Sequence, residues 1–436
     1  MYRSKHGNKY FPPIQFLAAG RLLALLLALP AGSAWAQTPA VATLATPSPL
    51  TLKQAFAAAW ERQPEAQSLE LRRDAAAARR QAADSWTAEP PALEASGKSD
   101  QATGNNGGRE YVAGIALPLW LPGERSRMGA LAEAEVRATS SRALAAQLRT
   151  AALVREAWWN WQRARGEQAL ASERLTGAQR LAADVGRRVK AGDLARSDQH
   201  QADGAAASAE VAQAEASSAL AAASQQLRAL TGRLPAAQGS DHPEPLPAIP
   251  ADFSTLDASH PAVVELFDRA EVARKSADLA GVQTRANPEL TLLSTRERGA
   301  FGDDWQTAIT VGVRIPFGSE SRNRAKAGQA RAEAVESEGL LRLERERLAA
   351  DLDAARLRVD AAKTQQAAAE KRARLAGESR GFFDKSFRLG ETDLPTRLRI
   401  ELDAVEAERQ AARARIDLAA AVSALRQALG LLPEQK

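Results

Sequence analysis

The side chains that could carry out chemistry are few and scattered in this sequence. Cysteine is absent, which excludes disulfides, thiolate metal sites and a lipid-modified N-terminal cysteine. The four histidines do not pair at helical metal-ligand spacing: His6, His200, His242 and His260. No nucleophile–base pair, glycine-rich phosphate loop or paired-acid signature stands out. The sequence therefore predicts no catalytic residue, no metal site and no cofactor, and a chain that is not an enzyme.

The remaining polar residues of interest gather around two glycines. Gly192 and Gly390 each interrupt a long helical stretch, and glycine suits a tight turn because it adopts positive φ freely. Residues that exposed turns would present lie beside them: Lys190, Arg388, Leu389 and Thr392. Four carboxylates also lie near the turns: Asp193, Asp198, Glu391 and Asp393. Helix capping is the interpretation we favour for these carboxylates, since Asp at a helix start accepts hydrogen bonds from free amides.

The N-terminus has the pattern of a cleaved secretory signal. Lys and Arg residues accompany an apolar stretch at Leu22–Leu29, and Ala34-Trp35-Ala36 matches a small-x-small cleavage site. The apolar run is shorter than the roughly 20 residues that a membrane-spanning helix needs. We therefore expect export, with a mature chain that starts at Gln37.

Removing this segment changes the net charge. The whole chain has formal charge +5, and residues 1–36 hold four Lys or Arg and no acid, which leaves +1 for the rest. Nucleic-acid binding, which a strongly basic chain would suggest, loses its support. No later apolar run is long enough to span a bilayer as a helix, so the mature chain is either soluble in the periplasm or crosses a membrane as β-strands.

The chain contains an internal repeat. Gly114 and Gly312 lie 198 residues apart, and so do Pro118 and Pro316. Further glycine and proline pairs keep this register within one residue: Gly192 with Gly390, Gly232 with Gly430, Pro235 with Pro433, Pro64 with Pro261, and Pro91 with Pro288. These markers indicate two copies of one supersecondary unit. We predict a signal peptide at 1–36, an N-terminal leader at 37–50, a first repeat at 51–235, a proline-rich linker at 236–254 and a second repeat at 255–433.

Each copy has the same predicted order of helix, two strands, very long helix, break and helix. The first copy is expected to hold a helix at Leu52–Ser85, strands at Ala92–Ser99 and Glu110–Leu121, and helices at Glu124–Lys190 and onward to Leu230. The second is expected to hold a helix at Ala258–Gln283, strands at Glu289–Arg296 and Trp305–Pro316, and a long helix at Ser321–Arg388. A helix of that length would extend about 100 Å.

The last predicted strand alternates residue by residue. One face holds Trp305, Thr307, Ile309, Val311, Val313 and Ile315, and the matching strand places Tyr111, Ala113, Ile115 and Leu117 on the equivalent face. A transmembrane barrel has this pattern, and so does a soluble sheet with one buried face. Two lone hairpins in an exported, helix-rich chain have little to pack against, which favours the barrel. Four strands cannot enclose a lumen, so a barrel would need several copies.

The long helices follow a different period. A 4-3 spacing typical of coiled coils joins Leu341, Leu348, Leu352, Ala355, Val359 and Ala362, with Arg345 at the one missed position. The run Trp158–Trp161 lies in the other long helix, where core packing is the expected role. Helices this long predict rods that project from the strands.

This ordered, duplicated set resembles the TolC-like outer-membrane efflux family, the outer membrane factors. The resemblance rests on the Gly-x-x-x-Pro strand ends, the long Ala/Arg/Glu helices, the two helix breaks, and Leu52-x-x-Ala55 with Gln63-Pro64-Glu65. It covers about Leu52 to Pro433. Within the family, Ala116–Trp120 and Trp158–Trp161 look most like the heavy-metal, CzcC-like branch.

The resemblance implies a mostly α fold with a small β contribution. Three chains would form an α-barrel tunnel and a twelve-stranded transmembrane β-barrel, with four strands from each chain. The implied function is the outer-membrane channel of a tripartite efflux pump, a passive exit duct for small molecules or metal cations that extends into the periplasm. The implied partners are two further copies, a periplasmic adapter (membrane fusion protein), an inner-membrane RND-type pump and outer-membrane lipid, with no nucleic acid.

The same resemblance places both helix turns at the inner end of the tunnel. There it implies adapter docking by Lys190, Gly192, Arg388, Leu389, Gly390 and Thr392, with turn chemistry alone as the alternative. The carboxylates Asp193, Asp198, Glu391 and Asp393 would ring the tunnel mouth and favour cations.

Other classes of protein stay open at this point. A channel of a type I protein secretion system fits the same pattern, because a channel sequence barely separates cargo classes. A periplasmic coiled-coil adapter would have one hairpin flanked by β-rich modules, whereas this chain has two hairpins and few strands. A soluble coiled-coil scaffold is the third alternative.

Overall fold

The computed structural model describes residues 50–235, 243–250, 258–318 and 320–434. The predicted signal peptide, nearly all of the leader and parts of the predicted linker lie outside these residues. The description below concerns the unit Pro47–Lys436.

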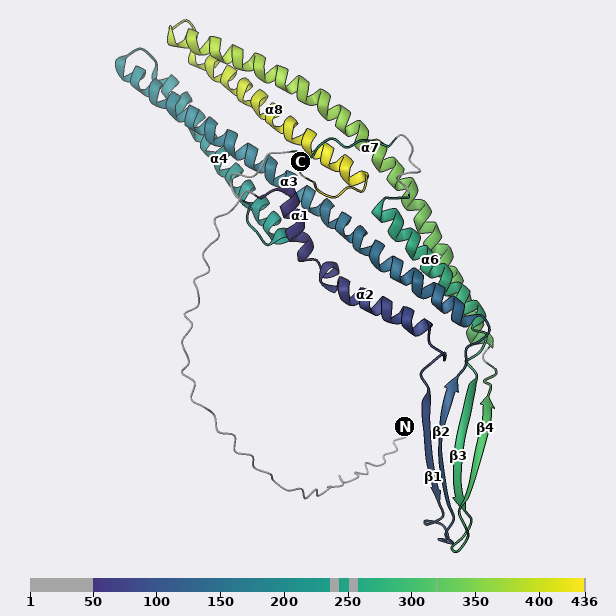
Figure 1. The fold of residues 1–436 in the computed structure, drawn as a ribbon. Helices are drawn as coiled ribbons and strands as arrows, with labels where there is room; N and C mark the ends of the chain where they lie inside the picture. The colour runs from purple at the N-terminus through teal and green to yellow at the C-terminus, as the bar shows by residue number, and fades with distance from the viewer. Residues whose placement is uncertain (1–49, 236–242, 251–257, 319, 435–436) are drawn as a thin grey trace, which may run out of the picture. The chain divides into compact units, whose positions relative to one another are not determined.

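The two halves of the chain have the same order of elements, except that two helices precede the strands in the first half and one in the second (Figure 1). The first half contains α1 (Leu52–Glu61), α2 (Pro64–Ala83), β1 (Ala92–Ser99), β2 (Arg109–Pro118), α3 (Glu124–Ala191) and α4 (Arg196–Thr231). The second contains α6 (Pro261–Val282), β3 (Glu289–Arg298), β4 (Gln306–Arg314), α7 (Glu320–Arg388) and α8 (Leu394–Ala428). The predicted fold class, mostly helical with one small sheet, is confirmed.

The first helix was predicted as one element, and the structure corrects this to two. The Thr51 side chain accepts a hydrogen bond from the Gln54 amide, and the Gln54 side chain accepts one from the Thr51 amide, so a capping box begins α1. Gln63 then takes an extended conformation, because the ring of a following proline disfavours the helical region. Pro64 occupies the first turn of α2, where its missing N–H costs nothing.

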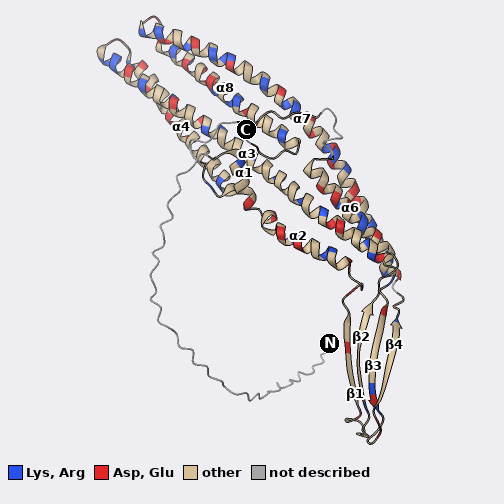
Figure 2. Cartoon of the chain, viewed as in Figure 1, with Lys and Arg blue, Asp and Glu red and all other residues tan. Residues whose placement is uncertain are grey.

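The helices pack side by side in pairs along their length. In α7 the predicted 4-3 positions Leu341, Leu348, Leu352, Ala355, Val359 and Ala362 are all buried, which confirms the coiled-coil interpretation. From Leu352 onward they pack against Val422 and Leu425 of α8. In α3, Trp158 and Trp161 are buried against Leu52 and Leu227, as the expected core role requires. Basic and acidic residues both recur along the helices (Figure 2).

None of the helices in the described part of the chain is long and apolar enough to cross a membrane.

The four strands form one antiparallel sheet in the order β1-β2-β3-β4. The strand β1 has the predicted bounds, whereas β2 ends at Pro118 rather than at Leu121. The close approach of β2 and β3 explains why Gly114, one of the duplicated glycines, has no side chain. A Cβ there would lie 2.4 Å from the Leu292 carbonyl oxygen. Any larger residue at that position would push β2 away from β3.

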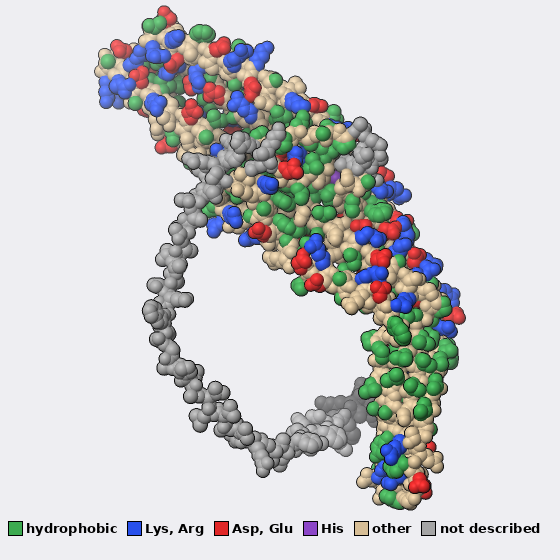
Figure 3. All heavy atoms as spheres, viewed as in Figure 1, with side chains coloured by type: hydrophobic (Ala, Val, Ile, Leu, Met, Phe, Trp, Pro, Cys, Tyr) green, Lys and Arg blue, Asp and Glu red, His purple; other side chains and the backbone are tan. Residues whose placement is uncertain are grey.

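The two faces of the sheet differ in chemistry. Tyr111 pairs with Arg296, and Arg296 pairs with Thr307, so these residues share one face, as predicted for Tyr111 and Thr307. We call it the apolar face; it carries Leu93, Ala113, Ile115, Leu292, Ile309, Val311 and Val313. Ile309 is 75% exposed and Val311 is 68% exposed. Figure 3 shows hydrophobic side chains gathered over the half of the strands nearer the helices. A single chain therefore leaves an apolar surface without a covering partner.

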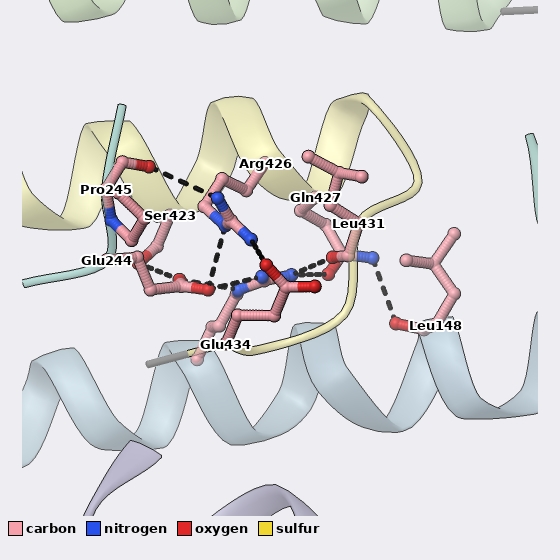
Figure 4. Close-up of polar contacts among 9 residues, drawn as sticks. Leu148, Glu244, Pro245, Ser423, Arg426, Gln427, Leu431 and Glu434 are labelled. Atoms are coloured by element: carbon pink, nitrogen blue, oxygen red, sulfur yellow. Dashed lines mark hydrogen bonds and ion pairs between the residues drawn. The ribbon is translucent and has the colours of Figure 1, made fainter. Parts of the chain in front are cut away.

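A buried ion cluster fastens the inter-repeat segment to both halves of the chain (Figure 4). The Glu244 carboxylate, 2% exposed, accepts hydrogen bonds from Arg155 of α3 at 2.7 and 3.0 Å. On its other side Arg426 of α8 approaches to 3.2 Å through Nε, an ion-pair contact without hydrogen-bond geometry, and Ser423 donates its hydroxyl. Arg155 also donates to the Leu431 carbonyl, so four parts of the chain meet at one carboxylate.

We expect Glu244→Ala to destabilise the protein strongly. Removing the carboxylate leaves the buried Arg155 guanidinium without its anion and leaves Arg426 only the exposed Glu434, a change that costs about 3–5 kcal/mol. Chemical unfolding of the purified protein in detergent measures it. The control is Glu370→Ala, which removes the exposed pair with Arg415 and should change little. Equal effects of the two substitutions would contradict the role of the cluster.

The burial of His260 leads us to expect that the stability of the protein depends on pH. Its Nδ1 accepts a hydrogen bond from the Ala262 amide at the start of α6, and burial lowers the pKa of the imidazole. Below the ordinary pKa of about 6.5 the unfolded chain then binds more protons than the folded one, so stability falls as the pH drops. His260→Asn keeps a capping acceptor and should flatten the change in thermal midpoint between neutral and mildly acidic buffer. His200→Asn, on the exposed surface of α4, is the control; an unaltered pH profile in His260→Asn would contradict the assignment.

Candidate functional site

The two helix turns have the same backbone geometry. Gly192 ends α3 with φ +87°, and Gly390 follows α7 with φ +81°. In each turn the next amide donates to a carbonyl five residues back, from Asp193 to Arg188 at 2.9 Å and from Glu391 to Ser386 at 3.0 Å. This is the helix-ending arrangement that favours glycine at the left-handed position. The predicted turns are therefore present at both glycines.

The turns of the two halves are joined to each other. Arg188 of α3 donates to the Arg388 carbonyl at 3.2 Å, and its guanidinium lies 5.2 Å from the centre of the Phe387 ring. Arg397 of α8 lies 4.8 Å from the same ring. Phe387 is 2% exposed and packs with Val185. The buried Phe387 ring therefore contacts two guanidinium groups, one from α3 and one from α8, and links the ends of α3, α7 and α8.

Asp384 completes this contact. It accepts a hydrogen bond from Arg397 at 2.9 Å and one from Arg388 at 3.1 Å. Arg388, a predicted docking residue, therefore already has an acidic partner within the chain. The sequence analysis missed Arg188, Phe387, Arg397 and Asp384, because nothing in their spacing shows that residues almost 200 positions apart meet. The one available signal was Phe387, a large apolar residue directly before an exposed turn.

The other predicted docking residues differ in their solvent exposure and in their contacts within the chain. Lys190, Gly192 and Gly390 are exposed, and no atom lies within 4 Å of a Cβ added to either glycine. Leu389 is 75% exposed, an unusual position for a leucine at a helix end. Thr392 is half-buried, and its hydroxyl lies 2.7 Å from the Ser386 hydroxyl. Leu389 and Lys190 are the side chains that the turns present outward without a structural partner among the described residues.

The four carboxylates have mostly local contacts. Asp393 begins α8 by accepting from the Thr396 amide at 3.3 Å, and Asp198 accepts from the Ala195 amide at 3.0 Å. Hydrogen bonds from Thr396, its side chain first and then its amide, lower the pKa of Asp393. Glu391 accepts from the Ser386 hydroxyl. Two of the four are thus capping residues in the way we favoured, and all of them lie at the turns. A role at a tunnel mouth stays a prediction.

The described residues include no group of three or more His, Asp or Glu side chains placed to hold a metal ion.

The comparisons with known proteins agree with this architecture. A family model described as outer membrane efflux protein matches residues 56–233. A membrane protein from Pseudomonas aeruginosa has a similar structure, with a TM-score of 0.70, 20% identity and 87% of this chain and 90% of that chain covered. VceC of Vibrio cholerae gives a TM-score of 0.69 and 16% identity, with 87% and 96% covered. CusC gives 0.72 and 18%, with 87% and 92% covered. The curated proteins contain no match.

The match to the outer membrane efflux protein model is confined to residues 56–233, and it agrees with the resemblance found in the sequence. The family model lies in the first repeat, and the structural likenesses carry the same fold across the second.

Substitution of the turn glycines tests whether the positive φ at these positions requires glycine. Gly390→Ala and Gly192→Ala should each destabilise the tip by roughly 1–2 kcal/mol, the cost of placing a Cβ at positive φ. Gly204→Ala, inside α4 and equally open to solvent, should instead stabilise by roughly 1 kcal/mol. Hydrogen exchange of the amides at the turns reports the difference. Stabilisation by Gly390→Ala would contradict the turn geometry.

Proposed function

We propose that three copies of this chain form one continuous duct, which receives cargo from a periplasmic adapter and an inner-membrane pump. The observation that carries the proposal is that the sheet is open on both sides. β1 and β4 are the outer strands, and each has only one neighbour in the described chain. Backbone groups within a bilayer must be paired, so β4 of one copy would pair with β1 of the next. Three such sheets close a barrel of twelve strands.

The helices support the same closure. Contacts place them in the order α2-α3-α6-α7 at the strand end and α4-α3-α8-α7 at the turn end. At both levels α7 lies on one side of the chain, and α2 or α4 lies on the other. Three copies arranged around an axis would bring α7 of one copy against α2 and α4 of the next, and would form a helical tunnel in line with the strands.

The turns are the proposed contact with the adapter. All four strands join the helices at one end, and the turns at Gly192 and Gly390 form the other end. With the strands in the outer membrane, the turns point into the periplasm. Leu389 and Lys190 are exposed there, and the carboxylates beside them would give the opening a negative rim.

Only the sequence resemblance favours one class of cargo over the others. Ala116–Trp120 and Trp158–Trp161 favour the branch that serves heavy-metal cation pumps, and acidic residues at the turns suit cations. Small organic molecules are the alternative within efflux, and a type I protein secretion channel is the alternative outside it.

The trimer is tested by extraction of membranes in mild detergent and by gel migration with and without heating. We expect a cross-linkable trimer in the outer-membrane fraction that dissociates on heating. A protein that stays soluble as a monomer or dimer without detergent would overturn the proposal.

Adapter docking is tested at Leu389. We expect Leu389→Ser to weaken binding of the purified adapter about tenfold, because burial of a leucine contributes roughly 1.5–3 kcal/mol. The trimer itself should stay intact, since Leu389 is exposed. Leu144→Ser, at an equally apolar exposed position far along α3, is the control. Unchanged adapter affinity in Leu389→Ser would remove the turn from the docking surface.

A further inference from the structure

The loop end of the sheet combines arginines and aromatic rings on the apolar face. Pairing places Arg109 opposite Arg298, and Tyr111 opposite Arg296. The indole of Trp305 lies 5.8 Å from the Tyr111 ring, 5.3 Å from the Arg296 guanidinium and 5.1 Å from that of Arg298. We call these five residues the rim cluster. Figure 3 shows Lys and Arg side chains gathered at this end of the strands.

Charges on the two faces are sorted by sign. The four glutamates of the strands, Glu94, Glu110, Glu289 and Glu297, all lie on the face opposite the rim cluster. There they meet basic partners, such as Lys98 with Glu110 and Arg314 with Glu289. The apolar face has three arginines and no carboxylate along its strands. Its positive charge therefore lacks a matching anion from the sheet.

The loops supply an anion to only one of the three arginines. Asp100, directly after β1, forms an ion pair with Arg109 at 3.1 Å. Asp303 accepts from the Ala300 amide at 2.8 Å, and within the described residues no carboxylate pairs with Arg296 or Arg298. Arg298 donates its Nε to the Gly107 carbonyl, whereas Arg296 is exposed and its guanidinium lies over the indole ring of Trp305.

A guanidinium on a lipid-facing strand is costly at the middle of a bilayer and tolerated at its edge. The rim cluster lies at the loop end of the strands, at the start of β2, the end of β3 and just before β4, and aromatic rings of this kind mark the interface level of membrane barrels. Stacking on Trp305 holds the Arg296 guanidinium in place and leaves its N–H groups outward. The planar guanidinium can donate two parallel N–H hydrogen bonds to two oxygens of one phosphate group.

We propose that the rim cluster binds the phosphate groups of lipopolysaccharide in the outer leaflet of the outer membrane. The inference rests on the proposed function for orientation, because the loop end faces outward only if the helices lie in the periplasm. Arg296 and the free side of Arg298 hold the phosphate, and Tyr111 and Trp305 contact the sugar and the start of the acyl chains. The apolar residues nearer the helices then contact hydrocarbon.

The test measures binding of three lipids to purified trimer in detergent: lipopolysaccharide, its dephosphorylated form, and phosphatidylglycerol. We expect Arg296→Gln to weaken lipopolysaccharide binding about tenfold, as for loss of a charge-assisted hydrogen bond. Arg296→Lys keeps the positive charge but lacks the planar guanidinium, and its affinity for lipopolysaccharide should lie between those of the wild type and Arg296→Gln. Dephosphorylated lipid should bind wild-type protein as weakly as intact lipid binds the variant. Lys98→Gln, at the same end of the sheet on the opposite face, should bind like wild type.

Equal affinity of wild type and Arg296→Gln would overturn the inference, and so would an equal loss in Lys98→Gln. Equal binding of phosphatidylglycerol would overturn lipopolysaccharide as the source of the phosphate. Heat-dependent gel migration of each variant shows that the trimer has formed. A trimer in the outer membrane that binds no lipopolysaccharide refutes this inference alone, whereas absence of the trimer refutes the proposed function and this inference with it.

Discussion

The two open edges of the sheet are the constraint on which the rest of the structure depends. An edge strand with unpaired N–H and C=O groups is a site for pairing with another chain, and within lipid it must be paired. The register of β2 with β3 joins the two repeats inside one chain, so the hairpin of each half already has one neighbour. Only β1 and β4 stay open, at opposite sides of the sheet. The exposed apolar face, the side-by-side helices and the matched turns all suit a closed ring of copies.

The duplicated chain must also keep its two halves in register along helices of 68 and 69 residues. Contacts at three levels do this. The sheet joins the halves at one end, Phe387 with Arg188 joins them at the other, and Glu244 joins them in between. The middle contact is the most buried, and it draws the inter-repeat segment into the structure. A segment that links the repeats in sequence therefore also links them in space.

Much of this could be predicted from local patterns. Alternation in 305–316 identified the apolar face, 4-3 spacing identified the buried side of α7, and spaced glycines located both turns, because each signal repeats within a few residues. The split at Pro64 was visible but was overlooked, since the surrounding residues favour helix on both sides. Glu244 and Phe387 could not be placed. Their partners are distant in sequence, and a proline-rich segment gives no sign that Glu244, one of its three acidic residues, is buried between arginines.

The most direct test of the central claim is disulfide formation between β1 and β4 of different copies. The chain has no cysteine, so Ala95→Cys in β1 can be combined in turn with Thr307→Cys, Ile309→Cys, Val311→Cys or Val313→Cys in β4. The account predicts that at least one register gives disulfide-linked dimers and trimers in isolated outer membranes. Cysteine at Ala113 of the interior strand β2, paired with the same β4 positions, should give none. Absence of linked species in every β1–β4 register would contradict closure of the sheet between copies.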